Sequence, residues 1–512
     1  MNGILNDVVK TKKKVDIEIY DVAKCFDKMS FKETANDMFK AGVTDDKFVL
    51  LANSNRISKV AVKTPWGSLT RRIEMEEIEM QGTVLAPLKC STQIDSIGRD
   101  CFETNAGLFK YKECVSIPPL SMIDDILAVA DCDYKAIEVN AIIQNKVNTK
   151  QLKFGANKCF QLHVGGNIEQ CSILKVQESN MKRSDKEKYL GDILTTDGKV
   201  NENVEERKAK GMGAANQILS ILQEISFGYS FFEMAMLFRT SIMINGMLCS
   251  SEALYGLNKA HMEKLEDSDK YLMKRIFDVG TGCPIASYFL ETGSTPVRFV
   301  LIGRRLMFLW TILQKTENEL VRKVYNSQKM FPVKDDWVLQ IRQDLAQCQI
   351  DFDEDKIGSM SKYKFKKLEN EKIYMLAYSY ILDEKCKCKL DRCKCKLANL
   401  STWKMQDYLI TDELVLSEKR LLYLLRVQMV EVKNNFKLRY GDNLQCSLCD
   451  NHLEDQESLL HCPEIVSAID TSEISYRDIF GNLEKQIKAI KIWKQIFQIR
   501  NSKLKKKSLT LV

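Results

Sequence analysis

Residues 15–27 read VDIEIYDVAKCFD, and this stretch decides the fold of the N-terminal part of the chain. Val15, Ile17 and Ile19 alternate with polar residues, and this period of two predicts a β-strand. The strand is predicted to end at Asp21. Asp21 is therefore an acid placed at the end of an apolar strand.

A second apolar stretch, residues 117–127 (IPPLSMIDDIL), predicts a short hairpin with Asp124 and Asp125 at its tip. Adjacent carboxylates in hydrophobic surroundings repel each other and resist burial, so a cation must offset them or the turn must face solvent. Mg²⁺ suits such a site, because it binds a few carboxylates together with substrate phosphates. Two such ions about 4 Å apart stabilise the attacking and leaving oxygens of phosphoryl transfer. This pattern alone fits both a metal site and a solvent-exposed acidic turn.

Other local signals predict a mixed first third of the chain. Ser30 and Glu33 have the spacing of a capping box at the start of a helix over residues 30–40. Residues 58–64 and 70–75 flank the turn sequence PWGS and predict a hairpin. After about residue 200 the pattern becomes helical.

Composition excludes several classes of protein. The 512 residues are 45% hydrophobic and 28% charged, as in ordinary globular proteins, and the length predicts about three domains. The best apolar run, residues 299–313, is interrupted by Arg304 and Arg305, so we expect no membrane span. The N-terminus lacks the apolar core of a secretory signal, and 17 cysteines then indicate a reducing compartment. We expect an intracellular protein, nuclear or cytoplasmic, that is not secreted.

Five motifs in order carry a family resemblance. They are Asp21-Val-Ala-Lys-Cys-Phe26-Asp27, the stretch from Gln81 and Gly82 to Pro87, Met122-Ile-Asp-Asp125, Gly155-Ala-Asn-Lys158 and Lys188-Tyr-Leu-Gly191. Together they resemble the reverse-transcriptase palm of non-LTR (LINE-type) retrotransposons, whose first motif commonly reads D-x-x-K-x-F-D. The resemblance covers roughly residues 15 to 330.

The resemblance implies roles for individual residues. Asp21, Asp124 and Asp125 would bind two Mg²⁺ ions, or Mn²⁺ in their place. Lys158 would protonate the leaving pyrophosphate, and its alternative is a surface lysine. The substrate-binding residues would be Phe26, Gln81 and Gly82. Phe26 would exclude a 2′-hydroxyl, and its alternative is a residue of the hydrophobic core. Gln81 and Gly82 would lie against the template and the incoming base.

The implied fold is α+β, with a polymerase-type palm that is incomplete at its N-terminus and lacks fingers, followed by a helical thumb and a helical C-terminal region. The predicted domains are a palm (1–195), a thumb (196–330), a helical linker with a Cys/Lys-rich loop (331–430), a Cys/His patch (431–470) and a basic helical tail (471–512). The implied activity is RNA-directed DNA polymerisation, a nucleotidyl transfer onto a primer 3′-OH with an RNA template, a DNA primer and dNTPs. The alternative is a catalytically silent nucleic-acid-binding remnant. Because only 20 residues precede Asp21, we expect the chain from Met1 to extend a primer poorly.

A Cys/His patch near the C-terminus resembles the CCHC zinc knuckle of such elements. Cys446, Cys449, His461 and Cys462 are its candidate zinc ligands. In the family pattern the histidine stands about four residues before the last cysteine, where this chain has Ser458. His452 is an alternative fourth ligand, and ordinary reduced thiols are the alternative to zinc. The repeated CKCKL of residues 386–397 reads as a basic loop.

The tail concentrates the positive charge of the chain. Residues 484–507 contain nine basic residues and one acid, whereas the whole chain carries only +7. One reading is a nucleic-acid anchor that acts through phosphate charge, and a nuclear-localisation signal would look the same. The other reading is a helix packed on the body of the protein, since its apolar residues lie nearly all round.

Overall fold

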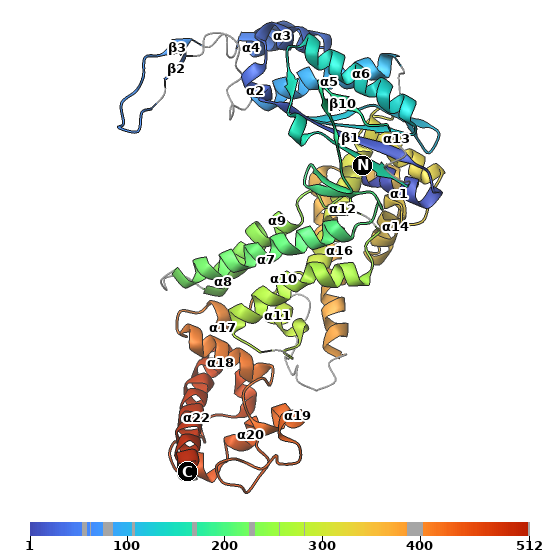
Figure 1. The fold of residues 1–512 in the computed structure, drawn as a ribbon. Helices are drawn as coiled ribbons and strands as arrows, with labels where there is room; N and C mark the ends of the chain where they lie inside the picture. The colour runs from blue at the N-terminus through green and yellow to red at the C-terminus, as the bar shows by residue number, and fades with distance from the viewer. Residues whose placement is uncertain are drawn as a thin grey trace. The chain divides into compact units, whose positions relative to one another are not determined.

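The computed structural model describes residues 1–53, 59–61, 63–74, 85–104, 108–165, 172–224, 231–254, 256–280, 282–386 and 403–509 (Figure 1). The chain is a mixture of helices and a small sheet, which confirms the α+β class. It divides into two compact units, each with its own internal packing. Unit 1 comprises Met1–Asn203, Ala253–Gly256 and Thr311–Arg342, and unit 2 comprises Val204–Glu252, Leu257–Trp310 and Gln343–Val512.

Unit 1 is built on a sheet with strand order β12-β9-β1-β7-β6, and β8 also pairs with β1. Its central strand β1 (Val15–Ala23) is antiparallel to β7 (Asp125–Ala130) and to β9 (Phe160–Val164). The other members are β6 (Leu120–Met122), β8 (Lys153–Phe154) and β12 (Lys182–Arg183). The predicted strand after residue 15 is present, but it continues two residues beyond its predicted end at Asp21, to Ala23, because Val22 and Ala23 pair with β8. The predicted acidic hairpin is also present.

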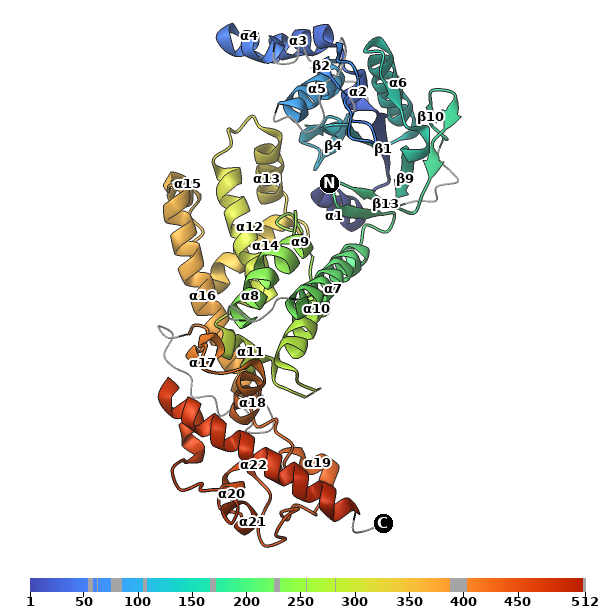
Figure 2. The same ribbon diagram turned by 90° about the vertical axis from the view of Figure 1, so that its left-hand side faces the viewer.

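Both faces of this sheet are covered. One face packs against α5 (Ala86–Thr104) and α6 (Asp133–Thr149) in a core that includes Tyr20, Ile94 and Ile143. The other face packs against α1 (Asn2–Thr11) and two small hairpins in a second core. Figures 1 and 2 show α5 and α6 on one side of the sheet and α1 on the other.

Covering both faces buries polar side chains of β1. Asp16 and Glu18 are buried on the face toward α6, although their alternation with isoleucines is the pattern of a half-exposed strand. Glu18 accepts a hydrogen bond from the Tyr20 hydroxyl at 2.6 Å, and Asp16 lies 3.0 Å from His163 Nδ1. Burial raises the pKa of Glu18 to about 8, despite the Tyr20 hydrogen bond that opposes the shift.

The other elements of unit 1 surround this sheet. The predicted hairpin around PWGS is present as β2 and β3, and the predicted helix after Ser30 is α3, where Ser30 caps the backbone of Glu33. The elements are α2 (Cys25–Lys28), α3 (Phe31–Lys40), α4 (Asp45–Asn53), β2 (Lys59–Val60), β3 (Ile73–Glu74), β4 (Phe109–Tyr111), β5 (Val115–Ile117), η1 (Ala156–Lys158), β10 (Lys175–Val176), β11 (Ser179–Asn180), β13 (Lys186–Tyr189), β14 (Asp192–Thr195) and α13 (Leu320–Met330).

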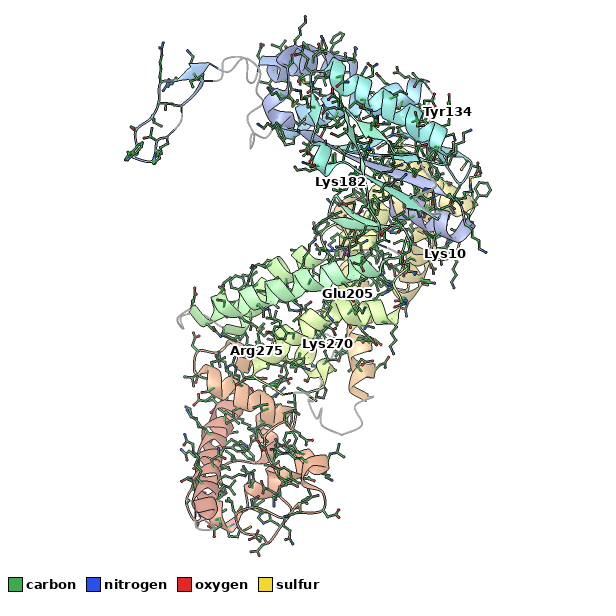
Figure 3. The ribbon with its side chains drawn as sticks, viewed as in Figure 1. Lys10, Tyr134, Lys182, Glu205, Lys270 and Arg275 are labelled. Carbon is green, nitrogen blue, oxygen red and sulfur yellow. The ribbon has the colours of Figure 1, made fainter. Side chains whose placement is uncertain are left out.

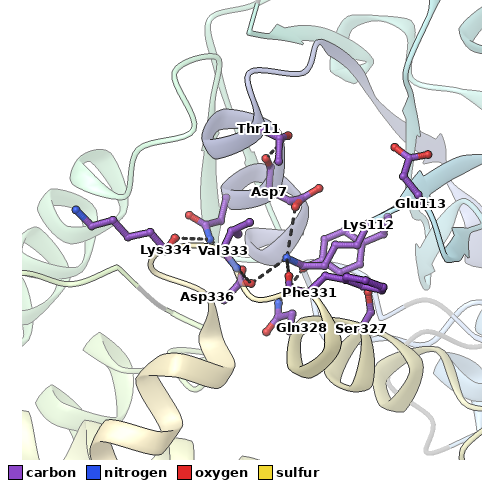
Figure 4. A network of polar contacts seen from close by, with 12 residues as sticks. Asp7, Thr11, Lys112, Glu113, Ser327, Gln328, Phe331, Val333, Lys334 and Asp336 are labelled. Carbon is purple, nitrogen blue, oxygen red and sulfur yellow. Dashed lines mark hydrogen bonds and ion pairs between the residues drawn. The ribbon is translucent and has the colours of Figure 1, made fainter.

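A buried ion network joins distant parts of unit 1 (Figure 4). The ammonium group of Lys112 donates to Asp336 Oδ2 at 2.9 Å and to the main-chain oxygen of Phe331 at 2.6 Å, and it lies 3.4 Å from Asp7 Oδ1. The three ionic side chains are nearly inaccessible to solvent. Residues 311–342 therefore pack with the N-terminal helix and the β4–β5 hairpin. The predicted boundary at residue 330 divides this segment between thumb and linker.

Unit 2 is helical, as the pattern after residue 200 predicts. Buried arginine–carboxylate pairs connect its helices: Arg239 with Asp269, and Arg305 with Asp344. Its elements, three of which begin or end in unit 1, are α7 (Asn201–Glu224), α8 (Phe231–Phe238), η3 (Arg239–Ile244), α9 (Asn245–Met247), α10 (Lys259–Phe277), α11 (Ile285–Thr292), α12 (Val297–Leu313), α14 (Trp337–Gln347), α15 (Glu354–Ser359), α16 (Lys362–Cys386), α17 (Asp407–Ile410), α18 (Leu416–Arg426), η5 (Lys433–Phe436), α19 (Lys437–Tyr440), α20 (Gln456–Leu459), α21 (Pro463–Val466), η6 (Tyr476–Phe480) and α22 (Leu483–Leu509). None of the helices in the ranges given above is long and apolar enough to cross a bilayer.

Candidate active site

Asp21 and Asp125 lie directly opposite each other on adjacent antiparallel strands. Asp21 is two residues beyond Ile19, and Asp125 is two residues before Leu127, so strand alternation puts both carboxylates on one face. The Cβ atoms of such a pair are about 5 Å apart. The register of β1 and β7 thus brings together two acids that are about 100 residues apart in the sequence.

Asp124 is held beside this pair by the turn between β6 and β7. Ile123 and Asp124 form a two-residue turn closed by the pair Met122 and Asp125. Ile123 has φ +60°, which is unfavourable for a β-branched residue, and only the first central residue of the turn has positive φ, as in a type II′ turn. The Asp124 carbonyl accepts a hydrogen bond from the Val22 N–H at 2.9 Å, which fixes the acidic turn against β1.

The crowding of these acids shows in their electrostatics. The pKa of Asp125 is raised, first by burial and then by the neighbouring carboxylates of Asp124 and Asp21, and Lys158 acts in the opposite direction. Half-buried carboxylates that repel one another are stabilised by a cation between them. This edge of the sheet therefore has the charge of a cation-binding site.

Lys158 is a cationic side chain bonded to this cluster. Its ammonium lies 3.3 Å from Asp21 Oδ2, and the lysine side chain is 71% exposed. Gly155, three residues earlier, donates its N–H to the Asp21 carbonyl. A Cβ on Gly155 would lie 2.8 Å from Asp21 Oδ1, so glycine allows this close approach. Lys182, which Figure 3 labels, lies on edge strand β12. Its ammonium donates to the carbonyl of Asn157, next to Lys158, at 3.2 Å.

Of the three predicted substrate-binding residues, the structure describes Phe26. Phe26 is half-buried and packs against the core on the α5–α6 side of the sheet, together with Ile123. Its neighbour Cys25 is buried and lies 2.7 Å from the sulfur of Cys90 on α5. Gln81 and Gly82 lie outside the described residues.

Tyr189 lies near the site. It belongs to the fifth motif, but the family resemblance implied no role for it. Its side chain is buried, and its hydroxyl donates to the Leu120 carbonyl at 3.3 Å, on the strand that leads to the acidic turn. Burial raises the pKa of Tyr189, and the negative charge of Asp125 adds to the shift. No spacing rule connects β13 to β6, so only the tertiary structure shows this support.

The described part of the chain contains one tight group of metal-ligating side chains, and it is not the aspartate cluster. The ligand atoms of Cys446, Cys449, His452 and Cys462 all lie within 4.8 Å of one another. Asp21, Asp124 and Asp125 do not form so compact a group, which is consistent with Lys158 bonding Asp21. A bound cation would have to draw the three carboxylates closer together.

The Cys/His group has the dimensions of a tetrahedral zinc site. The sulfurs of Cys446 and Cys462 are 3.9 Å apart, and Cys449 Sγ lies 3.3 Å from His452 Nδ1. Zinc bonds of about 2.3 Å to sulfur and about 2.0 Å to nitrogen place two sulfurs about 3.8 Å apart, and a sulfur and a nitrogen about 3.5 Å apart. The other ring nitrogen of His452, Nε2, is buried without a hydrogen-bond partner. A hydrogen bond of Nε2 therefore does not account for the half-buried position of the ring.

A short hairpin brings these ligands together. Gln445 and Leu453 form an antiparallel bridge, and the Cys446 N–H donates to the His452 carbonyl at 2.7 Å. This pairing places His452 beside the cysteines, whereas the predicted ligand His461 is exposed and is not part of the group. Ser458 instead bonds Asp455 in a capping box at the start of α20.

The basic tail is a helix packed on unit 2, as the second reading of its sequence predicts. Trp493 of α22 is fully buried, and α22 packs on α18. Four of its basic side chains form ion pairs: Lys488 with Glu473, Lys494 with Glu418, Arg500 with Glu454, and Lys503 with Glu464. The local charge available to a polyanion is therefore smaller than the sequence count suggests.

No protein-family model matches the chain, and no curated protein matches it. Among solved structures it is similar to apo telomerase from Candida tropicalis, with 12% identity and a TM-score of 0.35 over 72% of this chain and 54% of that one. Two further telomerases are in complex with a TWJ fragment of telomeric RNA. The Candida albicans structure has 14% identity and a TM-score of 0.28 over 63% of this chain and 54% of that one, and the Candida tropicalis complex has 12% and 0.31 over 63% and 51%.

The chain spans about half the length of the telomerase chains it matches.

Proposed function

We propose that unit 1 carries the nucleotidyl-transfer site of an RNA-directed DNA polymerase of the non-LTR retrotransposon type. The observation that supports this most is the direct pairing of Asp21 with Asp125 across β1 and β7, with Asp124 in the adjoining turn. Carboxylate oxygens on a rigid sheet edge suit Mg²⁺ or Mn²⁺. The motif order supports the retrotransposon assignment.

In this proposal Asp21, Asp124 and Asp125 would hold two divalent ions, which would supply charge stabilisation for attack of a primer 3′-OH on a dNTP. Asp21 and Asp125 orient their oxygens from paired strands, and the turn fixes Asp124. Lys158, which bonds Asp21 here, would donate its ammonium proton to the leaving pyrophosphate. The motif resemblance would place Phe26 at the sugar, and Gln81 and Gly82 at the template and incoming base.

The test is incorporation of dTMP on an RNA template of poly(rA) with a DNA primer of oligo(dT), in Mg²⁺ and in Mn²⁺. Asp125→Asn should remove incorporation, because phosphoryl transfer here depends on metal electrostatics. Asp131→Asn is the matched control, since Asp131 lies just beyond β7, is exposed and pairs with Lys135. Equal incorporation by the wild type and Asp125→Asn would refute the proposal.

A second candidate function is nucleic-acid binding without catalysis. The observation that favours it is the bond between Lys158 and Asp21, which neutralises one carboxylate without a metal ion. The same assay separates the two candidates. A silent binding protein would retain template–primer in a filter-binding measurement and incorporate no more dTMP than Asp125→Asn does.

We also propose that Cys446, Cys449, His452 and Cys462 bind one zinc ion. Three thiolates and an imidazole are a common structural zinc set, and the distances between their ligand atoms fit a tetrahedron. Bound zinc would hold together the hairpin and the segment before α21. Metal analysis of the purified chain should give one zinc per molecule, and a metal-free chain that takes up no added zinc would contradict this assignment.

A further inference from the structure

Glu454 connects the Cys/His group to the rest of unit 2. Its carboxylate is fully buried and accepts hydrogen bonds from the Ser447 N–H at 2.7 Å and from the Ser447 hydroxyl at 2.5 Å. Ser447 lies in the turn between the ligands Cys446 and Cys449. The orientation of Glu454 therefore depends on the conformation of that turn.

The same carboxylate anchors the C-terminal half of α22. Arg500 is 7% exposed, and its Nε donates to Glu454 Oε1 at 3.1 Å, with a second bond from its Nη2. A buried guanidinium needs this partner, because an unpaired charge in the interior is strongly unfavourable. The position of Arg500 is thus tied, through Glu454 and Ser447, to the cysteine turn.

A second contact reaches the other segment of the group. Lys503 donates to the main-chain oxygen of Glu464 at 2.9 Å and pairs with its carboxylate, and Glu464 is two residues after Cys462. The C-terminal half of α22 therefore contacts both segments that supply ligands. The N-terminal half is held differently, by Trp493 in the core and by Lys494 bonded to Glu418 of α18.

We propose that zinc in the Cys/His group controls the docking of the C-terminal half of α22, with Glu454 as the positioning residue between them. The inference rests on the zinc assignment above. Loss of zinc frees the cysteine turn, Ser447 no longer orients Glu454, and Arg500 loses its buried partner. Binding equilibria are reciprocal: the factor by which zinc strengthens docking of α22 is the factor by which docking strengthens zinc binding. A change in α22 that undocks its C-terminal half must therefore weaken zinc binding.

The test measures hydrogen exchange and zinc affinity on the full chain. Removal of zinc with a chelator should speed amide exchange at least tenfold in residues 496–509 and leave residues 485–494 unchanged. Arg500→Gln touches no ligand, yet it should weaken zinc binding about tenfold in a competition titration, and Arg500→Lys should restore part of that affinity. Glu454→Gln should act in the same direction, since partners beyond the ligands typically change metal affinity 10–100-fold.

Lys488→Gln is the matched control. Lys488 lies on the same helix as Arg500 and forms an exposed ion pair with Glu473, which precedes the helix. The substitution should leave both measurements unchanged. Zinc bound normally by Arg500→Gln, or α22 exchange unaffected by the chelator in a zinc-loaded chain, would overturn the coupling alone. A wild-type chain that binds no zinc would overturn the zinc assignment as well.

Discussion

Lys158 is the residue whose replacement separates metal binding from chemistry. Its ammonium lies 3.3 Å from Asp21 Oδ2, so it competes with a cation for that carboxylate. We expect Lys158→Met to tighten Mn²⁺ binding, by no more than about fivefold because the pair is exposed to solvent, and to slow dTMP incorporation. The measurements are a Mn²⁺ titration and single-turnover incorporation, with Lys175→Met on the β10–β11 hairpin as control. Unchanged Mn²⁺ affinity would show that Lys158 does not compete with a cation for the Asp21 carboxylate.

Glu18 predicts how the stability of unit 1 depends on pH. Its folded pKa of about 8 is above the ordinary value, because burial favours the neutral acid. Its contribution to the free energy of unfolding of unit 1 is therefore complete below about pH 4.5 and is lost as the pH rises through 8. The loss is on the order of several kcal/mol. Glu18→Gln keeps the shape without the charge, so its stability advantage over the wild type should grow from pH 5 to pH 8. Amide exchange of β1 and β7, compared between the two proteins at each pH, measures this, and an equal difference at both values would contradict it.

At the scale of single residues, the sequence predicted what short-range rules control. The alternation around Ile17 and the acids in residues 117–127 were enough to predict two strands and the acidic turn. The burial of Glu18 and the support from Tyr189 could not be predicted, because both depend on elements more than 60 residues away. The alternation pattern is the same whether a helix covers the second face of a strand or solvent does.

At the scale of elements, the hairpin of residues 445–453 decides which histidine joins the cysteines. We expect His452→Ala to lower the zinc content well below one per chain and His461→Ala to leave it unchanged. The two variants are matched in chemistry and differ only in the position of the ring, which is half-buried in the group for His452 and exposed for His461. Metal analysis after dialysis against a weak chelator is the measurement. The reverse result would mean that the hairpin register is not the one described.

The choice between these histidines shows the limit of spacing arguments. Two cysteines with two residues between them indicate a metal-binding turn, and this part of the prediction needs only local geometry. The fourth ligand depends on the pairing of Gln445 with Leu453, which no spacing in the sequence specifies. Ser458, which occupies the family position of the histidine, instead caps a helix.

At the scale of the whole molecule, the charge of the tail is partly neutralised within unit 2. Lys485, Lys488 and Lys491 are exposed on α22, whereas Arg500 is buried in its ion pair. Replacing the three exposed lysines with glutamine should reduce the salt dependence of nonspecific nucleic-acid binding, with log K against log[salt] flatter by about two units. The control replaces Lys259, Lys264 and Lys323, which lie on helices other than α22. An unchanged slope in the α22 variant would exclude the tail helix from the binding surface.

Mn²⁺ binding followed by electron paramagnetic resonance shows whether Asp21, Asp124 and Asp125 form one divalent-cation site. We expect the full chain to bind Mn²⁺ in competition with Mg²⁺. Binding should be lost or strongly weakened in Asp124→Asn and Asp125→Asn and should be normal in Asp131→Asn. Wild-type Mn²⁺ affinity and stoichiometry in Asp125→Asn would rule out this cation site, because the acid paired with Asp21 would then hold no metal ion.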